Sequence, residues 1–234
     1  MSRVPRSTLA ASFDARDPVL MAGFWAELLG REVLVEPAGR RLPGPGHELD
    51  LLFSAAPAPD APPRMHLHLT SDDTAHQQRT VARVVELGGR PLDVGQRPDE
   101  GHVVLADPEG NALCVIEPDN RFLAGCGRLG EVACDGSSAV GRFWSLAMGW
   151  PLVWDQDGET AIQSPDGGTK VAWGGPASVP TQGRAGHRLR LSTRPSDLAL
   201  EVDRLVAHGA TSLGSRDGGS VELLDPDGCV FHVG

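Results

Sequence analysis

The chain has 234 residues and a mass of 24.7 kDa, enough for one large domain or two domains of ordinary size. Acidic residues outnumber lysine and arginine by 31 to 21, and the net charge of −10 excludes a protein that holds nucleic acid through a basic surface. No apolar run approaches the roughly 20 residues of a membrane-crossing helix and the N-terminal segment lacks the apolar core of a secretory signal, so we expect a cytoplasmic protein without a membrane partner.

The first half of the chain predicts two helices, each followed by strands. Asp17 suits an N-cap and Pro18 the first helical position, and apolar residues at helical spacing continue from there to Gly30. A second helix is expected over roughly 73–87, just before Gly88. Short alternating or apolar runs predict the strands 31–36, 48–53, 65–70, 102–106 and 112–117.

The second half repeats the first. Residues 24–30 (FWAELLG) return as 143–149 (FWSLAMG), and residues 107–110 (DPEG) return as 225–228 (DPDG). Each half reads as two units of a strand, a helix and three strands, so the chain contains four βαβββ units. The matching helices of the second half are expected over roughly 137–148 and 196–208, and its strands over 151–155, 159–163, 169–173, 187–192, 220–224 and 229–233.

The repeat predicts two domains, 1–118 and 129–234, joined by a linker over 119–128 that contains two glycines and no periodicity. Residues 54–64 hold four prolines and are expected to form an extended surface connection between the two units of the first domain. The cysteines form neither a CxxC pair nor the spacing of a zinc site. We therefore expect reduced thiols, without a disulfide framework or a structural zinc.

These motifs resemble the vicinal oxygen chelate (VOC) superfamily, which includes glyoxalase I, bleomycin-resistance proteins and extradiol dioxygenases. The resemblance lies in FWAELLG, HLHLTSDD and ADPEGNALCVIEP of the first half and in FWSLAMG and LLDPDGCVFHVG of the second. It implies an α+β fold in which the four βαβββ modules form two tandem glyoxalase-like domains with curled, mixed, mostly antiparallel sheets around cavities. The same scaffold supports isomerisation, ring cleavage, thiol transfer and simple sequestration, so it does not decide between an enzyme and a binding protein.

In this superfamily a divalent metal is held by a His or Gln on the first strand, a His or Glu near the middle of the domain and a Glu on the last strand. Such a site leaves open positions for two vicinal substrate oxygens. In the first half these positions fall on residues 8–10 (TLA), His66 and Cys114, so only the histidine matches. Strand alternation would place His68 on the same face as His66, with Cys114 opposite.

In the second half the same positions fall on residues 129–131 (LGE), Arg188 and His232. An arginine puts a fixed positive charge where the cation would lie. Since neither half keeps the triad, we expect no metal cofactor. The alternative is an atypical site for Zn, Ni, Mn or Fe, formed by His66 with His68 or by His232 with Glu222 or Glu131.

The second half also offers groups that suit an acidic or planar ligand. Strand alternation groups Arg188 and Arg190 on one face with His232 across from them, an arrangement that would bind a carboxylate, enolate or phosphate. Trp154 and Trp173 lie on strands of the same half and could form a flat wall. The predicted ligand-binding residues are Arg188, Arg190, His232, His66, His68, Cys114, Trp154, Trp173 and Glu222.

Each candidate also has a structural interpretation. His66 and His68 could be a polar pair satisfied by backbone and water, and Cys114 could be a small buried apolar residue. The arginines could simply pair with Glu222 on a neighbouring strand, and the tryptophans could belong to the core.

We predict a protein that binds a small planar or acidic metabolite or antibiotic in a barrel cavity, without the complete metal triad. The alternatives are a metal-dependent lyase, isomerase or dioxygenase with an atypical site, and an interaction module with degenerate cavities. A tandem chain supplies internally the pairing that single-domain relatives obtain by dimerising, which favours a monomer over a homodimer.

Overall fold

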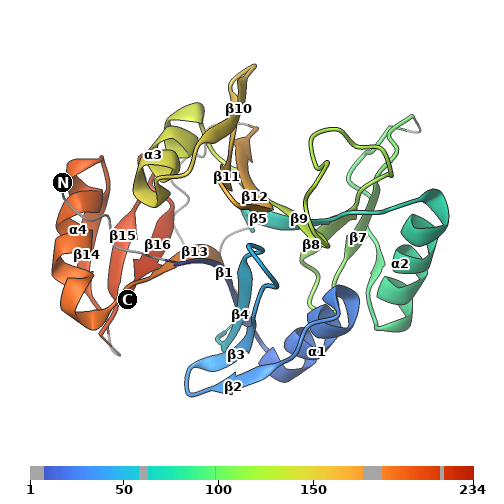
Figure 1. Cartoon of the computed structure of the whole chain (residues 1–234). Coiled ribbons are helices and arrows are strands. Elements are labelled where there is room, and N and C mark those ends of the chain that lie inside the picture. Colours follow the sequence, from blue (N-terminus) through green and yellow to red (C-terminus); the bar gives the residue numbers. More distant parts are fainter. Residues whose placement is uncertain (1–7, 58–62, 98, 176–185, 217–218) are drawn as a thin grey trace.

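The computed structural model describes residues 8–57, 63–97, 99–175, 186–216 and 219–234. In these ranges sixteen strands form two curved eight-stranded sheets, against which four α-helices pack (Figure 1). Sheet A contains, in spatial order, β14 (Thr211–Ser215), β15 (Val221–Leu224), β16 (Val230–Val233), β13 (His187–Ser192), β1 (Thr8–Ala15), β4 (Asp50–Ala55), β3 (Gly39–Leu42) and β2 (Leu34–Glu36). Sheet B contains β10 (Leu152–Gln156), β11 (Glu159–Ser164), β12 (Gly167–Gly174), β9 (Leu129–Asp135), β5 (Met65–Leu69), β8 (Ala112–Val115), β7 (Val103–Ala106) and β6 (Arg90–Pro91). The helices are α1 (Pro18–Leu29), α2 (Thr74–Glu86), α3 (Ser138–Met148) and α4 (Leu198–Ala207), the last preceded by the short 3-10 helix η1 (Pro195–Asp197).

The helices begin and end where the local signals predict. Oδ1 of Asp17 accepts hydrogen bonds from the backbone N–H groups of Val19 and Leu20, and Gly30 ends α1 in the left-handed conformation with φ of 66°. Gly149 ends α3 in the same way. Among the described residues, no helix has the length and apolar character needed to cross a bilayer.

One apolar core runs through both sheets. The predicted core pairs on α1 and α3 are confirmed, because Phe24, Trp25, Phe143 and Trp144 each expose 3% or less of their surface. The two sheets are also joined by a polar contact, in which Nδ1 of His187 on β13 lies 3.0 Å from the carbonyl oxygen at the start of β5. The two sheets are therefore in direct contact, through the apolar core and through this polar contact.

The composition of the sheets corrects the expectation that each half of the chain encloses its own cavity. Sheet A combines the first module (β1–β4) with the fourth (β13–β16), and sheet B combines the second (β5–β8) with the third (β9–β12). In sheet A, β1 pairs antiparallel with β13, and in sheet B, β5 pairs antiparallel with β9. Hydrophobic alternation determines which face of a strand is buried, but it does not determine which distant strand lies beside it. The boundaries 1–118, 119–128 and 129–234 stay predictions about the sequence repeat.

The expected mixed, mostly antiparallel sheets are present, but the expected barrel is not. Each sheet is open, with edge strands β14 and β2 in sheet A and β10 and β6 in sheet B. Strands β1, β3, β6, β9 and β14 lie outside the predicted strand ranges, although the pattern of four βαβββ units requires β1 and β9. Of the proline-rich loop 54–64, residues 58–62 lie outside the described residues.

The predicted linker, 119–128, is a series of turns that covers one face of sheet B. Leu123 is buried in a small apolar cluster that also contains Cys114 of β8. Nζ of Lys170 on β12 donates a hydrogen bond to the carbonyl oxygen of Phe122 and lies 4.4 Å from the centroid of its ring. The linker thus occupies the space over this face of sheet B.

Candidate functional site

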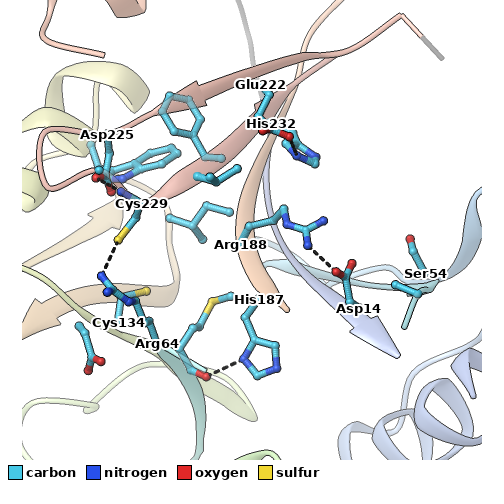
Figure 2. Close-up of a pocket in the computed structure, with 18 of the residues that line it drawn as sticks. Asp14, Ser54, Arg64, Cys134, His187, Arg188, Glu222, Asp225, Cys229 and His232 are labelled. Carbon is cyan, nitrogen blue, oxygen red and sulfur yellow. Dashed lines mark hydrogen bonds and ion pairs between the residues drawn. The ribbon is translucent and has the colours of Figure 1, made fainter. Parts of the chain in front are cut away.

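A cavity of about 700 Å³ lies between the two sheets (Figure 2). One wall comes from sheet A, where the ends of β1 and β4 meet β13, β15 and β16. The other wall comes from the start of β5 and from β9, β12 and α3. Residues of both sheets therefore line this cavity.

Strand alternation and register place the charged side chains of sheet A on one face. On β13, Leu189 and Leu191 are buried while Arg188 and Arg190 are half-buried, so the arginines face away from the core. His232 of β16 lies opposite Arg190 in one pairing and opposite a glutamate of β15 in the next. Residues that are paired across strands share a face, and these side chains therefore gather there.

Arg188 forms an ion pair with a residue that the sequence reasoning did not select. Its Nη2 atom lies 2.6 Å from Oδ2 of Asp14, at the end of β1. Figure 2 shows the two side chains facing each other beside the cavity. The side chains expose only 13% and 5% of their surface, so the pair is largely shielded from water.

His232 and Glu222 form a second polar pair, with Nε2 of the histidine 3.2 Å from the carboxylate. Burial lowers the pKa of His232 to about 4, and the positive charges of Arg188 and Arg216 act in the same direction. Burial alone would raise the pKa of Glu222, but the hydrogen bond and charge of Arg216 outweigh it and lower that pKa. At neutral pH the cavity thus presents an uncharged imidazole beside an ionised carboxylate.

Aromatic rings and a cysteine line other parts of the cavity, with contributions from both sheets and from α3. Trp144 and Trp173 stack at 6.3 Å between centroids, and Phe231 lies 4.9 Å from Trp144. Nη1 of Arg64 donates to Sγ of Cys229 at 3.6 Å, and both residues line the cavity. The cavity lining therefore combines aromatic rings with three guanidinium groups, and with the carboxyl groups of Asp14, Asp135, Glu222 and Asp225.

Four of the predicted ligand-binding residues line this cavity: Arg188, His232, Glu222 and Trp173. Arg190 shares the face of Arg188 but is not among the lining residues. Trp154 lies on the edge strand β10 with 38% of its surface exposed and meets the ring of Phe122 edge-on. The expected pairing of the arginines with Glu222 is replaced by the pairing of Arg188 with Asp14 and of Glu222 with Arg216.

Sequence reasoning missed Asp14, Arg64 and Cys229. Asp14 follows a buried, mostly apolar run near the end of β1. A carboxylate at the end of such a run was a sequence signal that could have identified it as a candidate site residue. Arg64 and Cys229 reach the cavity only because β5 and β16 come together from different modules, and no local pattern predicts that contact.

The remaining predicted residues gather on sheet B. His66 and His68 alternate on β5, and Cys114 of β8 lies in register with His68. The ligand atoms of these three residues all lie within 4.8 Å of one another. Nδ1 of His68 also lies 2.6 Å from Oε2 of Glu131, which is in register with it on β9.

The two histidines on sheet B have opposite electrostatic environments. Burial and the neighbouring charge of His68 lower the pKa of His66 to about 4. Burial would lower the pKa of His68 as well, but its hydrogen bonds with Cys114 and Glu131 outweigh this and raise it. His68 and Glu131 therefore form a charged pair next to a neutral imidazole.

The metal positions implied by the superfamily can be tested on each sheet. On sheet A they are residues 8–10, Arg188 and His232. The guanidinium and the lack of an imidazole, side-chain amide or carboxylate at residues 8–10 do not fit a cation. On sheet B the exchange of modules unites His66 and Cys114 with Glu131 of the third module. Imidazole, thiol and carboxylate donors are all present there, so only sheet B fits a metal ion.

Comparisons with known proteins agree with the fold. A family model described as "Glyoxalase-like domain" matches residues 10–116 and again 131–234. Glyoxalase I from Zea mays superposes with a TM-score of 0.70 at 15% identity, covering 97% of this chain and 92% of the maize chain. A putative dioxygenase from Bacillus subtilis superposes with a TM-score of 0.61 at 14% identity, covering 99% of this chain and 86% of the other. A search of curated protein sequences found no match.

Proposed function

Because the chain belongs to the glyoxalase-like family of the vicinal oxygen chelate superfamily, we propose that it binds a small planar or acidic molecule in the cavity between the two sheets. The observation that carries this proposal is that guanidinium groups and aromatic rings line the same 700 Å³ space. Pockets for small molecules have volumes of about 300–1,000 Å³ and combine an apolar lining with a few polar groups. The cavity has both properties.

The guanidinium groups that line the cavity favour a ligand with a carboxylate or enolate group. Arg188 lines the cavity from β13, Arg64 from the residue before β5 and Arg216 from the residue after β14. The contact between Arg188 and Asp14 holds that guanidinium in place, so a ligand anion meets an already oriented group. The neutral imidazole of His232 can donate to or accept from a neighbouring ligand oxygen.

The aromatic wall favours a flat apolar body. Trp173 and Phe231 line the cavity and are held by their contacts with Trp144. Rings that are fixed by packing offer contact area without the loss of side-chain freedom on binding. An aromatic or enolic acid would place its ring against this wall and its oxygens against the guanidinium groups.

The test compares aromatic carboxylic acids with their carboxamides, using thermal shift and then calorimetry on the full chain. We expect the acids to bind and the amides to bind at least about tenfold more weakly, because a charge-assisted hydrogen bond contributes about 1.5–3 kcal/mol. Arg188→Gln combined with Asp14→Asn should remove this preference without leaving an unpaired carboxylate. Arg142→Gln on α3, which removes an exposed ion pair with Asp155, is the control.

Equal binding of acids and amides, or an acid preference that survives the double substitution, would contradict the proposal. The alternative of a metal-dependent lyase, isomerase or dioxygenase remains a prediction. The one observation that favours a metal lies on sheet B, outside this cavity.

A further inference from the structure

The turn between β15 and β16 differs in one side chain from its counterpart in the second module. Residues 225–229 (DPDGC) repeat residues 107–111 (DPEGN), so Cys229 stands where the other turn has Asn111. In both turns Oδ1 of the first aspartate accepts hydrogen bonds from the backbone N–H groups two and four residues later. The two turns therefore share a backbone structure, and the residue at the fifth position distinguishes them.

The exchange of asparagine for cysteine leaves a carboxylate oxygen without a partner. Nδ2 of Asn111 donates to Oδ2 of Asp107 at 2.8 Å, whereas Cys229 has no side-chain N–H group to offer Asp225. Among the described residues, Oδ2 of Asp225 has no hydrogen-bond partner, although this residue exposes only 8% of its surface. Buried polar atoms nearly always have a partner, so this oxygen requires an explanation. Asp225 lines the cavity, from which a ligand or a proton can reach it.

The cysteine lies between this carboxylate and a guanidinium group. The backbone N–H of Cys229 donates to Oδ1 of Asp225 at 2.9 Å, and Nη1 of Arg64 donates to Sγ of Cys229 at 3.6 Å (Figure 2). All three residues line the cavity. A neighbouring guanidinium stabilises a thiolate, which is the nucleophilic form of cysteine.

We propose that Cys229 adds covalently to the conjugated C=C bond of an unsaturated carboxylic acid, with Arg64 stabilising the thiolate and Asp225 carrying the proton. The proposal rests on the proposed function, because the acid must first bind in the cavity.

The step is an addition in which nothing is lost. Oδ2 of Asp225 takes the thiol proton, the sulfur forms a bond to the β carbon, and the π electrons of the C=C bond move towards the conjugated carbonyl group to give an enolate. Asp225 then returns the proton to the α carbon. The product is a thioether, and the step needs neither an oxidant nor a second reactant.

The charges around the turn support these roles. Burial raises the pKa of Asp225 to about 6, the charge of Asp227 adds to this rise, and the charge of Arg64 opposes it. Near neutral pH such a carboxyl group can both accept and donate a proton. Cys134 of β9 also lines the cavity, but burial raises the pKa of its thiol well above the ordinary value. Asp135, beside it, is the other carboxyl group whose charge interacts with Arg64. Of the two thiols, Cys229 is therefore the one suited to react.

The test treats the full chain with 3-benzoylacrylic acid, which is an aromatic unsaturated acid, or with its carboxamide. Mass spectrometry of the intact chain and of its peptides measures the rate and the place of labelling. Each rate is divided by that of the same compound with N-acetylcysteine, which removes the difference in intrinsic reactivity. We expect a single adduct on Cys229, formed at least about tenfold faster with the acid than with the carboxamide, because the cavity guanidinium groups bind the carboxylate. The saturated analogue 3-benzoylpropionic acid should bind without reacting and slow the labelling.

Two substitutions of the nucleophile separate its chemistry from its packing. Cys229→Asn introduces the side chain of the matching turn and Cys229→Ser keeps the size of the cysteine, so both should melt cooperatively and lack the adduct. Cys126→Ser is the matched control, because it changes a linker thiol bonded to Gln163, and it should be labelled on Cys229 at the wild-type rate.

Asp225→Asn tests the proton carrier. We expect it to slow the addition about 100-fold, which is a typical contribution of general acid–base catalysis. The wild-type rate should level off above about pH 7, where Asp225 is ionised, whereas the rate of the variant should keep rising with pH as the thiol itself ionises. A purely structural role of Asp225 would not change the shape of this profile.

The outcomes distinguish the covalent step from the binding function. Labelling of Cys229 no faster than that of Cys126, or a wild-type rate and pH profile in Asp225→Asn, would overturn the proposal. If 3-benzoylpropionic acid binds and Cys229 is not labelled, the covalent step is wrong and the proposed binding function stands. If the saturated acid does not bind and Cys229 reacts equally with the acid and the carboxamide, the proposed function is wrong, and the acid is wrong as the substrate class.

Discussion

Arg188 and Asp14 lie 174 residues apart in the chain, yet their Nη2 and Oδ2 atoms are 2.6 Å apart at the edge of the cavity. The contact joins β13 of the fourth module to β1 of the first. It therefore links the first and last modules of the chain and orients the guanidinium group that we propose binds the ligand.

Removing one member of this pair should destabilise the fold. Asp14→Ala leaves Arg188 largely buried without its carboxylate, and breaking a buried pair in this way costs about 3 kcal/mol. Urea denaturation followed by tryptophan fluorescence measures the change. Asp14→Ala combined with Arg188→Met should recover most of the loss, because no charge is then left unpaired. A loss below about 1 kcal/mol for Asp14→Ala would mean that the pair is effectively solvated.

Acidification should weaken the fold through His232. Its pKa is lowered to about 4 by burial and by Arg188 and Arg216, whereas an unfolded histidine titrates near pH 6.5. Between these values the unfolded chain binds more protons, so stability is full above about pH 6.5 and declines as the pH falls towards 4. His66, with a pKa of about 4, contributes in the same direction.

Denaturation curves between pH 7 and pH 4 measure this slope. His232→Gln should make it shallower, whereas the exposed His208→Gln should leave it unchanged. An identical slope in His232→Gln and the wild type would show that folding does not lower the pKa of His232, which would contradict the prediction.

Asp225 should have the opposite dependence on pH. Burial raises its pKa to about 6, so its stabilising contribution is present below about pH 4 and is lost as the pH rises through 6. Asp225→Asn keeps an oxygen that can accept the backbone N–H groups of Asp227 and Cys229. We expect this variant to be more stable than the wild type by about 2 kcal/mol at pH 8, and equally stable near pH 3.5. A difference of the same size at both pH values would contradict the assignment to charge burial.

Two glycine substitutions should have opposite effects. A Cβ at Gly141 on α3 would lie 2.0 Å from Oγ1 of Thr160 and 3.2 Å from Trp173, so Gly141→Ala should destabilise the chain by about 1–3 kcal/mol and disturb the aromatic wall. A Cβ at Gly23 on α1 meets nothing within 4 Å, and Gly23→Ala should stabilise by about 0.5–1 kcal/mol through helix propensity. Thermal melting of the two variants tests both signs, and tryptophan fluorescence tests the effect on Trp173. A neutral Gly141→Ala would show that α3 can shift away from β11.

Much of the fold could be predicted because its signals are local. Asp17, Pro18 and Gly30 delimit α1, and the repeat of the Phe-Trp motif reveals that the second half of the chain repeats the first. Alternation on β5 and β13 also predicted which side chains share a face, since successive side chains of a strand point to opposite sides. Strand β3 was missed because it has the sequence GRRL, which contains a single apolar side chain and no alternation.

The candidate sites depended on contacts that no local pattern encodes. His66 and Cys114 were interpreted together with residues 8–10, whereas the structure places Glu131 of the third module beside His68, which is on the same strand as His66. Glu222 was considered as the ion-pair partner of Arg188, whereas in the structure Arg188 pairs with Asp14. In each case the missing residue came from a module in the other half of the chain.

The sequence by itself determined the module, its fourfold repetition, the faces of its strands and the superfamily, because capping, periodicity and repeated motifs are properties of short segments. Only the tertiary structure decided that the first module pairs with the fourth and the second with the third. It also decided that the cavity lies between the two sheets and that the linker covers one face of sheet B. Any of the four modules offers strand edges of similar chemistry, so the choice between them is made by the packing of the whole chain.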